Sequence, residues 1–336
     1  MGGMNNAPPE DGLPERTWDG LPVAPDDPRG AQIVVRRPAG PGGAETEYLM
    51  LHRAVHGPGY EGDWAWTPPS GARLPGEPIL AGAERELAEE AGLRAVRLHP
   101  ADLSGPWAVF AADVPPDTRV TLDAEHDRFA WLRGDEAAHR CLPAPVALTF
   151  RLAATLPTPS VTFRPLAAGD LPDMVAWMHA PHAARWFYED LDLAAAERKY
   201  RPRIDGSSPV RVHVILIGGR ACGFIQHYPV RGHPGYHPDA GEPAAAGIDY
   251  LIGVEALTGL GLGPQMIWSY LTDVVFATCP DVPRVIASPE VANRRSVRML
   301  QKAGFRPDRE IAGNEAGRPE LLCVLDRKRV FGPARH

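Results

Sequence analysis

The sequence is poor in lysine, and its charge balance is acidic. Only three of the 336 residues are lysine, and the formal net charge is −7 with an isoelectric point near 6.0. Nucleic acids and anionic membranes are bound by clustered Lys and Arg side chains, so this balance argues against both as partners. We therefore expect small-molecule substrates.

Cysteine and long apolar runs are also scarce. The chain has no stretch of eighteen apolar residues and no basic segment followed by an apolar one at its start, which argues against a membrane span or signal peptide. The cysteines lie far apart without a CxxC pair, so a zinc knuckle or disulfide framework is not expected, and a reducing cytoplasm fits best. They are Cys141, Cys222, Cys279 and Cys323.

The length predicts two domains, because about 150 residues is typical of one. Residues 1–28 are rich in Pro, Gly, Asn and Asp without hydrophobic periodicity, which predicts a disordered tail. The segment 155–160, TLPTPS, has two prolines that break any helix and is predicted to be a linker. We therefore expect one domain over residues 29–154 and another over 161–332.

The first half alternates strand and helix patterns. Strands are predicted over Ala31–Val35, Glu47–His52, Trp107–Asp113 and Asp127–Leu132. A helix is predicted over Glu77–Ala91, followed by a glycine that suits a helix C-terminus. This pattern indicates a mixed domain in which one helix carries much of the charge.

Three carboxylates share one face of that helix. Glu86, Glu89 and Glu90 stand at i, i+3 and i+4 within GARLPGEPILAGAERELAEEAGL, which begins at Gly71. Like charges at this spacing destabilise a bare helix by roughly 0.2–0.5 kcal/mol per pair, unless a divalent cation offsets them. Oxygen-only ligands suit Mg²⁺ or Mn²⁺. The alternative is a solvated acidic helix face.

The complete pattern resembles the Nudix box, G-x5-E-x7-R-E-U-x-E-E-x-G-U with U aliphatic. The resemblance covers residues 30–154 and implies an α/β/α sandwich that hydrolyses a nucleoside diphosphate linked to another group. Carried over, the Gly71 carbonyl with Glu86, Glu89 and Glu90 would hold the metal, and Arg85 would orient the carboxylates. Glu86 is also the candidate base that would deprotonate the attacking water.

Two segments outside the box are candidates for supporting roles. Glu125, in DAEHDRFAWL, would supply a further carboxylate for substrate or metal, or is an exposed strand-end acid. The neighbouring Asp123 and Asp127 leave that choice open. Trp64 and Trp66, in DWAWTPPSG, are expected to pack in the core rather than stack on a base.

The second half contains a glycine turn between a strand and a helix. A buried-strand pattern at Tyr250–Val254 is followed by TGLGLG, residues 258–263, and then by the helical run PQMIWSYLTDVVF. Free backbone N–H groups at such a helix start can bind a phosphate. Glycines in this arrangement also serve ordinary tight turns.

Together with SPEVANRRSVRMLQKAGF, residues 288–305, this half resembles the Gcn5-related N-acetyltransferase (GNAT) family over residues 161–331. Both halves are therefore expected to be α/β (α+β), the second with a mixed sheet. The resemblance implies acetyl-coenzyme A as cofactor and three groups of contacts. These are the pyrophosphate on Leu260, Gly261, Leu262 and Gly263; the pantetheine on Asn293; and the thioester on main-chain groups from Ile252 to Val254.

Two positions depart from the family pattern. Thr258 stands where a Gln or Arg usually precedes the glycines, which removes a long polar contact. Leu300 stands where many relatives have a tyrosine that protonates the departing thiolate. Another group must donate that proton, or the thiolate leaves unaided. Tyr250 and Tyr270 are possible donors.

Within the family, the chain resembles aminoglycoside 6'-N-acetyltransferases, which implies a role in antibiotic resistance. The likeness rests on HAARWFYED, GIDYLI and the helix over 292–305. Asp249 would bind the substrate ammonium and accept its proton, and Trp186 with Phe187 would form an aromatic wall against the cationic sugar. Alternatively, Asp249 is a strand-edge acid paired with an Arg, and Trp186 and Phe187 pack in the core. Other acids could extend the rim: Glu189, Asp190, Asp239 and Glu242.

Other readings of the chain stay open. Hydroxylysine acyltransferases of siderophore assembly share similar helices and aromatic pairs. One half could instead be a ligand-binding regulatory module, although the intact carboxylate set argues for hydrolysis. His233 and His237 lie in a Gly and Pro loop, which favours solvated side chains over a metal site. The sequence thus predicts a cytoplasmic Mg²⁺-dependent Nudix hydrolase fused to an acetyl-coenzyme A-dependent N-acetyltransferase.

Overall fold

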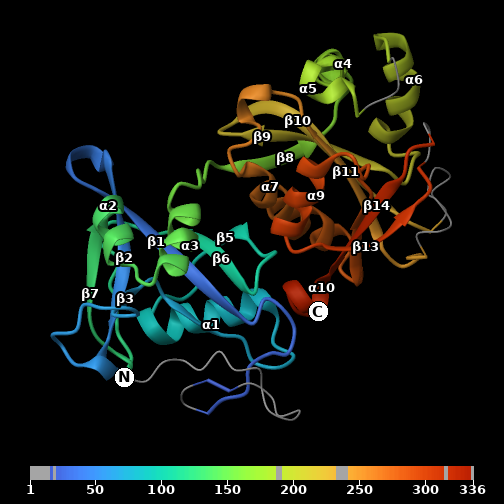
Figure 1. The fold of residues 1–336 in the computed structure, drawn as a ribbon. Helices are drawn as coiled ribbons and strands as arrows, with labels where there is room; N and C mark the ends of the chain where they lie inside the picture. Colours follow the sequence, from blue (N-terminus) through green and yellow to red (C-terminus); the bar gives the residue numbers. More distant parts are fainter. Residues whose placement is uncertain (1–15, 18–19, 187–190, 232–240, 314–316, 334–336) are drawn as a thin grey trace. The chain divides into compact units, whose positions relative to one another are not determined.

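The computed structural model divides the chain into two compact units, the first of residues 1–98 and 103–154 and the second of residues 155–336 with the short segment 99–102. It describes residues 16–17, 20–186, 191–231, 241–313 and 317–333. Each unit is built on its own mixed sheet, as the ribbon in Figure 1 shows. No helix within these residues is long and apolar enough to cross a membrane.

The first unit contains a seven-stranded sheet in which β3-β2-β1-β6-β5 are neighbours, β4 pairs with β1 and β7 pairs with β2. Its strands are β1 (Gly30–Ala39), β2 (Glu45–Arg53), β3 (Trp66–Thr67), β4 (Ser70–Ala72), β5 (Leu98–Asp102), β6 (Trp107–Asp113) and β7 (His126–Arg133). Its α-helices are α1 (Ile79–Ala91), α2 (Gly134–Arg140) and α3 (Ala144–Ala154), with short 3-10 turns η1 (Pro41–Gly43) and η2 (Ala54–His56). The predicted strands are all present.

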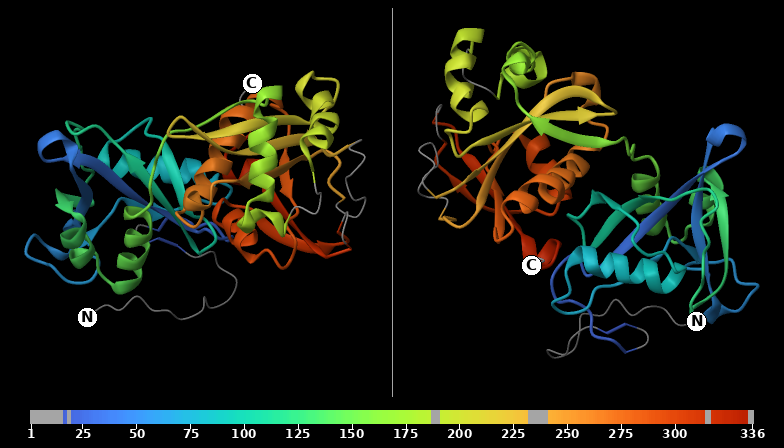
Figure 2. Two further views of the ribbon diagram at one scale, coloured as in Figure 1. Left: turned by 90° about the horizontal axis from the view of Figure 1, so that it is seen from above. Right: turned by 180° about the vertical axis from the view of Figure 1, so that it is seen from behind.

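Two helices enclose this sheet. Both α1 and α3 pack against β1, and they lie on opposite sides of it in the views of Figures 1 and 2. The centre of β1 is fully buried at Ile33, Val34 and Val35. A strand buried on both faces reads as a continuous apolar run, which is why AQIVV predicted it. The first unit is thus the expected α/β/α sandwich.

Helix α1 begins two residues later than predicted, at Ile79, with Pro78 at its N-cap. Glu77 stays outside the helix because its carboxylate accepts the Leu74 N–H at 2.9 Å and pairs with Arg85. The helix ends as predicted at Gly92, whose φ of 70° lies in the left-handed region that glycine adopts without strain.

The disordered tail was predicted to extend to residue 28, but the last residues of that segment pack against the first unit. Val23 and Ala24 are buried, and the Ala24 N–H donates to the Arg73 carbonyl at 2.7 Å. The Arg73 side chain in turn donates to the Pro28 carbonyl at 2.8 Å and the Asp26 carbonyl at 2.7 Å. Because Arg73 lies more than 40 residues from the carbonyls that it binds, no local sequence pattern indicates this contact.

The second unit contains a seven-stranded sheet in the order β13-β14-β12-β11-β10-β9-β8. Its strands are β8 (Val161–Pro165), β9 (Arg211–Ile217), β10 (Arg220–Pro229), β11 (Ala246–Ile252), β12 (Arg284–Ala287), β13 (Arg306–Ile311) and β14 (Glu320–Asp326). Its α-helices are α4 (Leu171–His179), α5 (Pro181–Ala184), α6 (Leu193–Ile204), α7 (Leu262–Tyr270), α8 (Phe276–Thr278), α9 (Arg294–Lys302) and α10 (Arg327–Val330). Three further turns complete it: η3 (Ala168–Asp170), η5 (Glu255–Leu257) and the π-helical η6 (Leu271–Val275).

Alternate residues of the central strands face different helices. Val212, Phe224 and Leu251 share one core cluster with residues of α4 and α6. His213, which follows Val212, and His227, three residues after Phe224, contact Tyr270 of α7 instead. Since successive side chains of a strand point to opposite faces, α4 and α6 cover one face of the sheet and α7 covers the other.

Candidate active sites in the two units

The predicted metal site is organised around Arg85. Its guanidinium donates to Glu77 at 2.9 and 3.1 Å, to Glu86 at 2.8 Å, to Glu89 at 3.0 Å and to the Ala72 carbonyl at 2.8 Å. A guanidinium spreads five N–H donors over a planar fork, whereas a lysine ammonium has three donors on a single atom and cannot reproduce this set of contacts. The orienting role predicted for Arg85 is compatible with these contacts.

Gly71 and Glu86 are in close contact. A Cβ at Gly71 would overlap the Glu86 carboxylate, so only glycine allows this approach. Burial raises the pKa of Glu86 to about 7; Arg85 opposes the shift and the Glu89 charge adds to it. The box therefore requires glycine at its first position for a steric reason, because a side chain there would occupy the space of a carboxylate.

Glu90 is the most buried of the three carboxylates, with 5% of its surface exposed. Its Oε2 atom accepts the Ser70 N–H at 2.7 Å. Burial raises the pKa of Glu90 well above its ordinary value, and the hydrogen bond from Ser70 opposes that shift only in part. The nearby charges of Glu86 and Asp123 raise it further.

The carboxylates do not converge as a metal-ligand group. Within the described part of the chain, no three His, Cys, Asp or Glu side chains are gathered so as to hold a metal ion. Glu86 and Glu89 both turn to Arg85 instead. The donor set still suits a hard cation, because all ligands are oxygens and the buried charges of Glu86 and Glu90 need an offsetting charge. With the Gly71 carbonyl, these three glutamates are the residues that would hold Mg²⁺ or Mn²⁺.

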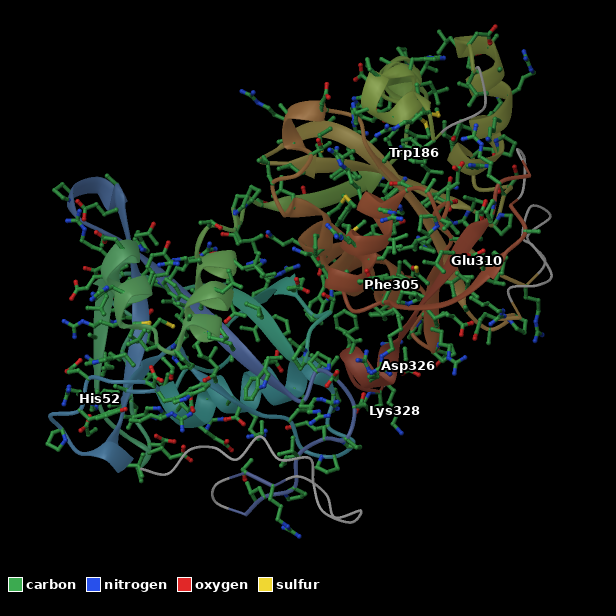
Figure 3. All side chains as sticks on the ribbon, in the orientation of Figure 1. His52, Trp186, Phe305, Glu310, Asp326 and Lys328 are labelled. Atoms are coloured by element: carbon green, nitrogen blue, oxygen red, sulfur yellow. The ribbon has the colours of Figure 1, made fainter. Side chains whose placement is uncertain are left out.

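The acids around the start of β7 have separate partners. Asp127 lies 2.7 Å from Nδ1 of His52, which is labelled in Figure 3. Asp123 lies 2.9 Å from Nδ1 of the buried His126 and accepts the Glu125 N–H at 3.1 Å. Asp123 also contributes to the raised pKa of Glu90. Asp123 is therefore a candidate, beside Glu125, to support the site.

The two tryptophans before the box differ from each other. Trp66 is buried and its indole N–H donates to Glu61 at 2.7 Å, so it packs in the core as predicted. Arg128 and Arg140 lie 5.2 and 5.4 Å from its ring centroid. Trp64, in contrast, is 37% exposed and has a φ of 66°, so core packing was wrong for this residue.

In the second unit, β11 and β12 part from each other. They pair in parallel only at Ala246↔Val285 and Gly247↔Ile286, while β11 continues to Ile252. The rest of β11 keeps its antiparallel pairing with β10 as far as Gly223↔Ile252. A strand that loses one neighbour in mid-course leaves backbone groups accessible at that side of the sheet.

The glycine turn leads directly into α7. Gly259 and Gly261 have φ values of 76° and 81°, and Gly261 is the N-cap of a helix that begins at Leu262 without a side-chain cap. The first N–H groups of such a helix are available to an anion. Gly263 serves a different purpose, because a Cβ there would overlap Met299 of α9.

The main-chain groups after β11 are already engaged. The Ile252 carbonyl lies 2.9 Å from Nε2 of His182, and the N–H groups of Gly253 and Val254 donate to the Cys222 carbonyl at 2.7 and 3.3 Å. The thioester contacts expected at Ile252 to Val254 stay a prediction. Nδ1 of His182 is buried without a hydrogen-bond partner.

Asn293 caps a helix in the structure. Its side-chain oxygen accepts the Ser296 N–H at 3.2 Å at the start of α9. This leaves the amide N–H₂ of Asn293 as the group that could meet a pantetheine carbonyl.

Asp249 is exposed and held by an amide. Gln226, directly opposite on β10, donates to its Oδ2 at 2.7 Å, and the Gln226 carbonyl accepts from Arg203 of α6 at 2.8 Å. Because arginine can only donate, it fixes which end of the amide faces Asp249. Asp249 is thus linked to Arg203 through the Gln226 amide.

The aromatic wall is described only in part. Trp186, labelled in Figure 3, is partly exposed and has the Arg185 guanidinium 4.9 Å from its ring centroid. Glu242 of the predicted acidic rim pairs with Arg284 at 2.6 Å. The other expected residues lie outside the described part of the chain: Phe187, Glu189, Asp190, His233, His237 and Asp239.

The candidate proton donors have very different surroundings. Tyr270 is fully buried, and its hydroxyl lies 3.0 Å from Nδ1 of His213 and 2.8 Å from Nδ1 of His227. The hydroxyl of Tyr250 lies 2.6 Å from Oγ of Ser296, and both residues are partly exposed. The two histidines were missed in the sequence, where a lone His inside an apolar strand was the only signal.

Comparison with known proteins divides the chain in the same way. Residues 27–150 match the family model of the NUDIX domain, and residues 167–312 match that of an acetyltransferase (GNAT) domain. An aminoglycoside N(6')-acetyltransferase type 1 of Klebsiella pneumoniae is 27% identical over 150 residues, which are 44% of this chain and 74% of that protein.

Two further similarities concern an octanoyltransferase and a solved structure. An octanoyltransferase of Myxococcus xanthus is 34% identical over 130 residues, 35% of this chain and 34% of that protein. A crystal structure of an aminoglycoside acetyltransferase with coenzyme A is 26% identical and covers 51% of this chain and 96% of its own, with a TM-score of 0.46.

Proposed function

Since the chain joins a NUDIX domain to an acetyltransferase domain of the GNAT family, we propose that it catalyses two reactions on small molecules. The first is Mg²⁺-dependent hydrolysis of a nucleoside diphosphate derivative. The second is transfer of an acetyl group from acetyl-coenzyme A to an amine of an aminoglycoside-like substrate. The four free cysteines are compatible with a cytoplasmic protein.

The acetyl acceptor is proposed from Asp249. An exposed carboxylate, oriented by Gln226 and placed where β11 has parted from β12, suits a substrate ammonium. Asp249 would bind that ammonium and take up one proton, which frees the nitrogen lone pair to attack the thioester carbonyl. The similarity to an aminoglycoside N(6')-acetyltransferase over 74% of its length supports a cationic sugar as substrate.

The acetyl donor is proposed from the start of α7. Two glycines with positive φ and an uncapped helix N-terminus form an anion site that suits a coenzyme A pyrophosphate. We assign it to the backbone of Leu260, Gly261, Leu262 and Gly263. The amide of Asn293 would then meet the pantetheine arm.

The acceptor can be tested by coenzyme A thiol release with purified protein against kanamycin, tobramycin, N6-hydroxylysine and simple polyamines. We expect release with the aminoglycosides and its loss in Asp249→Asn, because an amide cannot accept the ammonium proton. Asp308→Asn changes an exposed aspartate of β13 and is the matched control. Release with hydroxylysine alone would instead support a siderophore-type acyltransferase.

The hydrolase activity is proposed from the buried carboxylates around Gly71. Bound Mg²⁺ would neutralise diphosphate oxygens and acidify a water molecule. The chain's own part is to hold the ion with Glu86, Glu89 and Glu90, to orient two of these carboxylates through Arg85, and to take up the water proton at Glu86.

This proposal is tested by calorimetric titration of Mn²⁺ and by phosphate-bond cleavage with a panel of nucleoside diphosphate derivatives. Glu86→Gln and Glu90→Gln are expected to lose both metal binding and cleavage. Glu136→Gln removes an exposed carboxylate of α2 that pairs with Arg140, and should leave both unchanged. Full cleavage in Glu89→Gln would contradict its assignment as a ligand.

A further inference from the structure

The acetyltransferase domain has no obvious donor for the proton that the departing sulfur needs. Leu300 is fully buried and apolar, so it cannot donate one. Tyr270 is equally buried, and its hydroxyl is already shared between His213 and His227. Neither residue can protonate a thiolate at the opening between β11 and β12.

The hydroxyls of Tyr250 and Ser296 form a pair of different character. Their oxygens lie 2.6 Å apart, which is a short O–H···O hydrogen bond. Tyr250 lies on β11 three residues beyond Gly247, the last that pairs with β12, and Ser296 lies in the first turn of α9. The pair therefore joins the free edge of β11 to the helix that Asn293 caps.

We propose that Tyr250, supported by Ser296, is the catalytic acid that protonates the coenzyme A thiolate. This inference rests on the proposed acetyltransferase function. Asp249 and Tyr250 are consecutive on β11, so their side chains point to opposite faces of the strand. The carboxylate is held on the α6 face by Gln226, while the phenol lies on the α9 face with Ser296. One strand would thus place base and acid on two sides of the thioester.

The proton balance of the step is simple. The substrate ammonium gives up two protons, one to Asp249 and one to water, as its nitrogen forms a bond to the carbonyl carbon. When the carbon–sulfur bond breaks, sulfur keeps the electron pair and takes the phenolic proton of Tyr250. Ser296 stabilises the resulting phenolate by donating a hydrogen bond, and water returns the proton. The products are the N-acetylated amine and the coenzyme A thiol.

Burial keeps the phenol protonated before the reaction. It raises the pKa of Tyr250 and the Ser296 hydrogen bond lowers it, so Ser296 offsets part of the cost of giving up the proton. A serine partner lowers the cost of the phenolate without supplying a permanent charge.

The contact is tested without turnover by measuring the affinities of coenzyme A and desulfo-coenzyme A by calorimetry. The wild-type protein is expected to prefer coenzyme A by roughly five- to tenfold, because a hydrogen bond to sulfur is lost in the desulfo compound. Tyr250→Phe should bind the two equally. Tyr48→Phe, whose hydroxyl donates to the Ala154 carbonyl in the other domain, should keep the preference. An unchanged preference in Tyr250→Phe would overturn the proposal.

Turnover supplies the second readout. Tyr250→Phe is expected to lower kcat for acetyl transfer roughly 100-fold or more, with KM for acetyl-coenzyme A little changed, as befits loss of an acid. Ser296→Ala should cause a smaller loss. If the wild-type protein acetylates an amine and Tyr250→Phe does so equally fast, only this inference fails. If the wild-type protein acetylates no amine, the proposed function fails and this inference with it.

Discussion

Replacing Tyr270 by phenylalanine should destabilise the acetyltransferase domain, although it removes a single oxygen. The ring would keep its place, because it is fully buried and packs edge-on against Phe163 at 5.0 Å between centroids. What is lost is the hydroxyl that joins His213 and His227. A hydroxyl can donate once and accept from the other side, so it satisfies Nδ1 of both imidazoles when both are neutral.

The size of the effect follows from burial. Each buried polar group left without a partner costs about 1–3 kcal/mol. His227 is only 4% exposed and should lose the full amount, whereas His213 is partly exposed and can recover some hydrogen bonding from water. We therefore expect Tyr270→Phe to lower the free energy of unfolding by about 2–4 kcal/mol.

Native-state hydrogen exchange measures this loss within the full chain. Amide hydrogens of β9, β10 and α7 that exchange only when the whole domain unfolds should exchange roughly 30- to 700-fold faster. Every 1.4 kcal/mol of lost unfolding free energy raises the exchange rate tenfold. Peptides from the NUDIX domain serve as the internal control. In a double-mutant cycle with His227→Phe, the second change should cost less when Tyr270 is already Phe. Exchange within a factor of three of wild type in Tyr270→Phe would refute the reasoning.

Three other predictions concern the same two domains. Gly71→Ala should abolish diphosphate cleavage, because the added methyl would displace the Glu86 carboxylate, while circular dichroism should show an intact fold; undiminished cleavage would contradict the steric role. Arg85→Lys should lower the stability of the NUDIX domain by about 1–3 kcal/mol in urea unfolding, because the three donors of an ammonium cannot replace all the hydrogen bonds of the guanidinium. Acid should destabilise the acetyltransferase domain: burial lowers the pKa of His227 to about 4 and also lowers that of His213, so the unfolded chain binds protons that the folded one does not. About 3 kcal/mol from His227, fully present above pH 6.5, should be lost as the pH falls toward 4, and a flat profile in that window would refute it.

Features that depend on a few adjacent residues were predictable from the sequence. The helix over residues 79–91 and its stop at Gly92 follow from periodicity and from the left-handed φ that glycine tolerates. The helix start was less accurate, because Glu77 is held outside by Leu74 and Arg85. The glycines before α7 were found for the same local reason, since two of them need positive φ.

Partners far apart along the chain were not predictable. The sequence placed Asp249 in the amine site but could not show that Gln226 and Arg203 orient it. It offered Tyr250 and Tyr270 as equal candidates, and only their surroundings separate them. Strand register decides which side chains lie opposite each other, and a shift of one residue would exchange the two faces.

The sequence by itself therefore determined the two domains, their chemical motifs and the residue types available for catalysis. Tertiary structure alone decided which groups are paired, buried or exposed: the glutamates around Arg85, the amide behind Asp249 and the hydroxyl beside Tyr250. The physical reason is distance along the chain. Turn and helix geometry are set by neighbouring residues, whereas these pairings form only when separate strands and helices pack together.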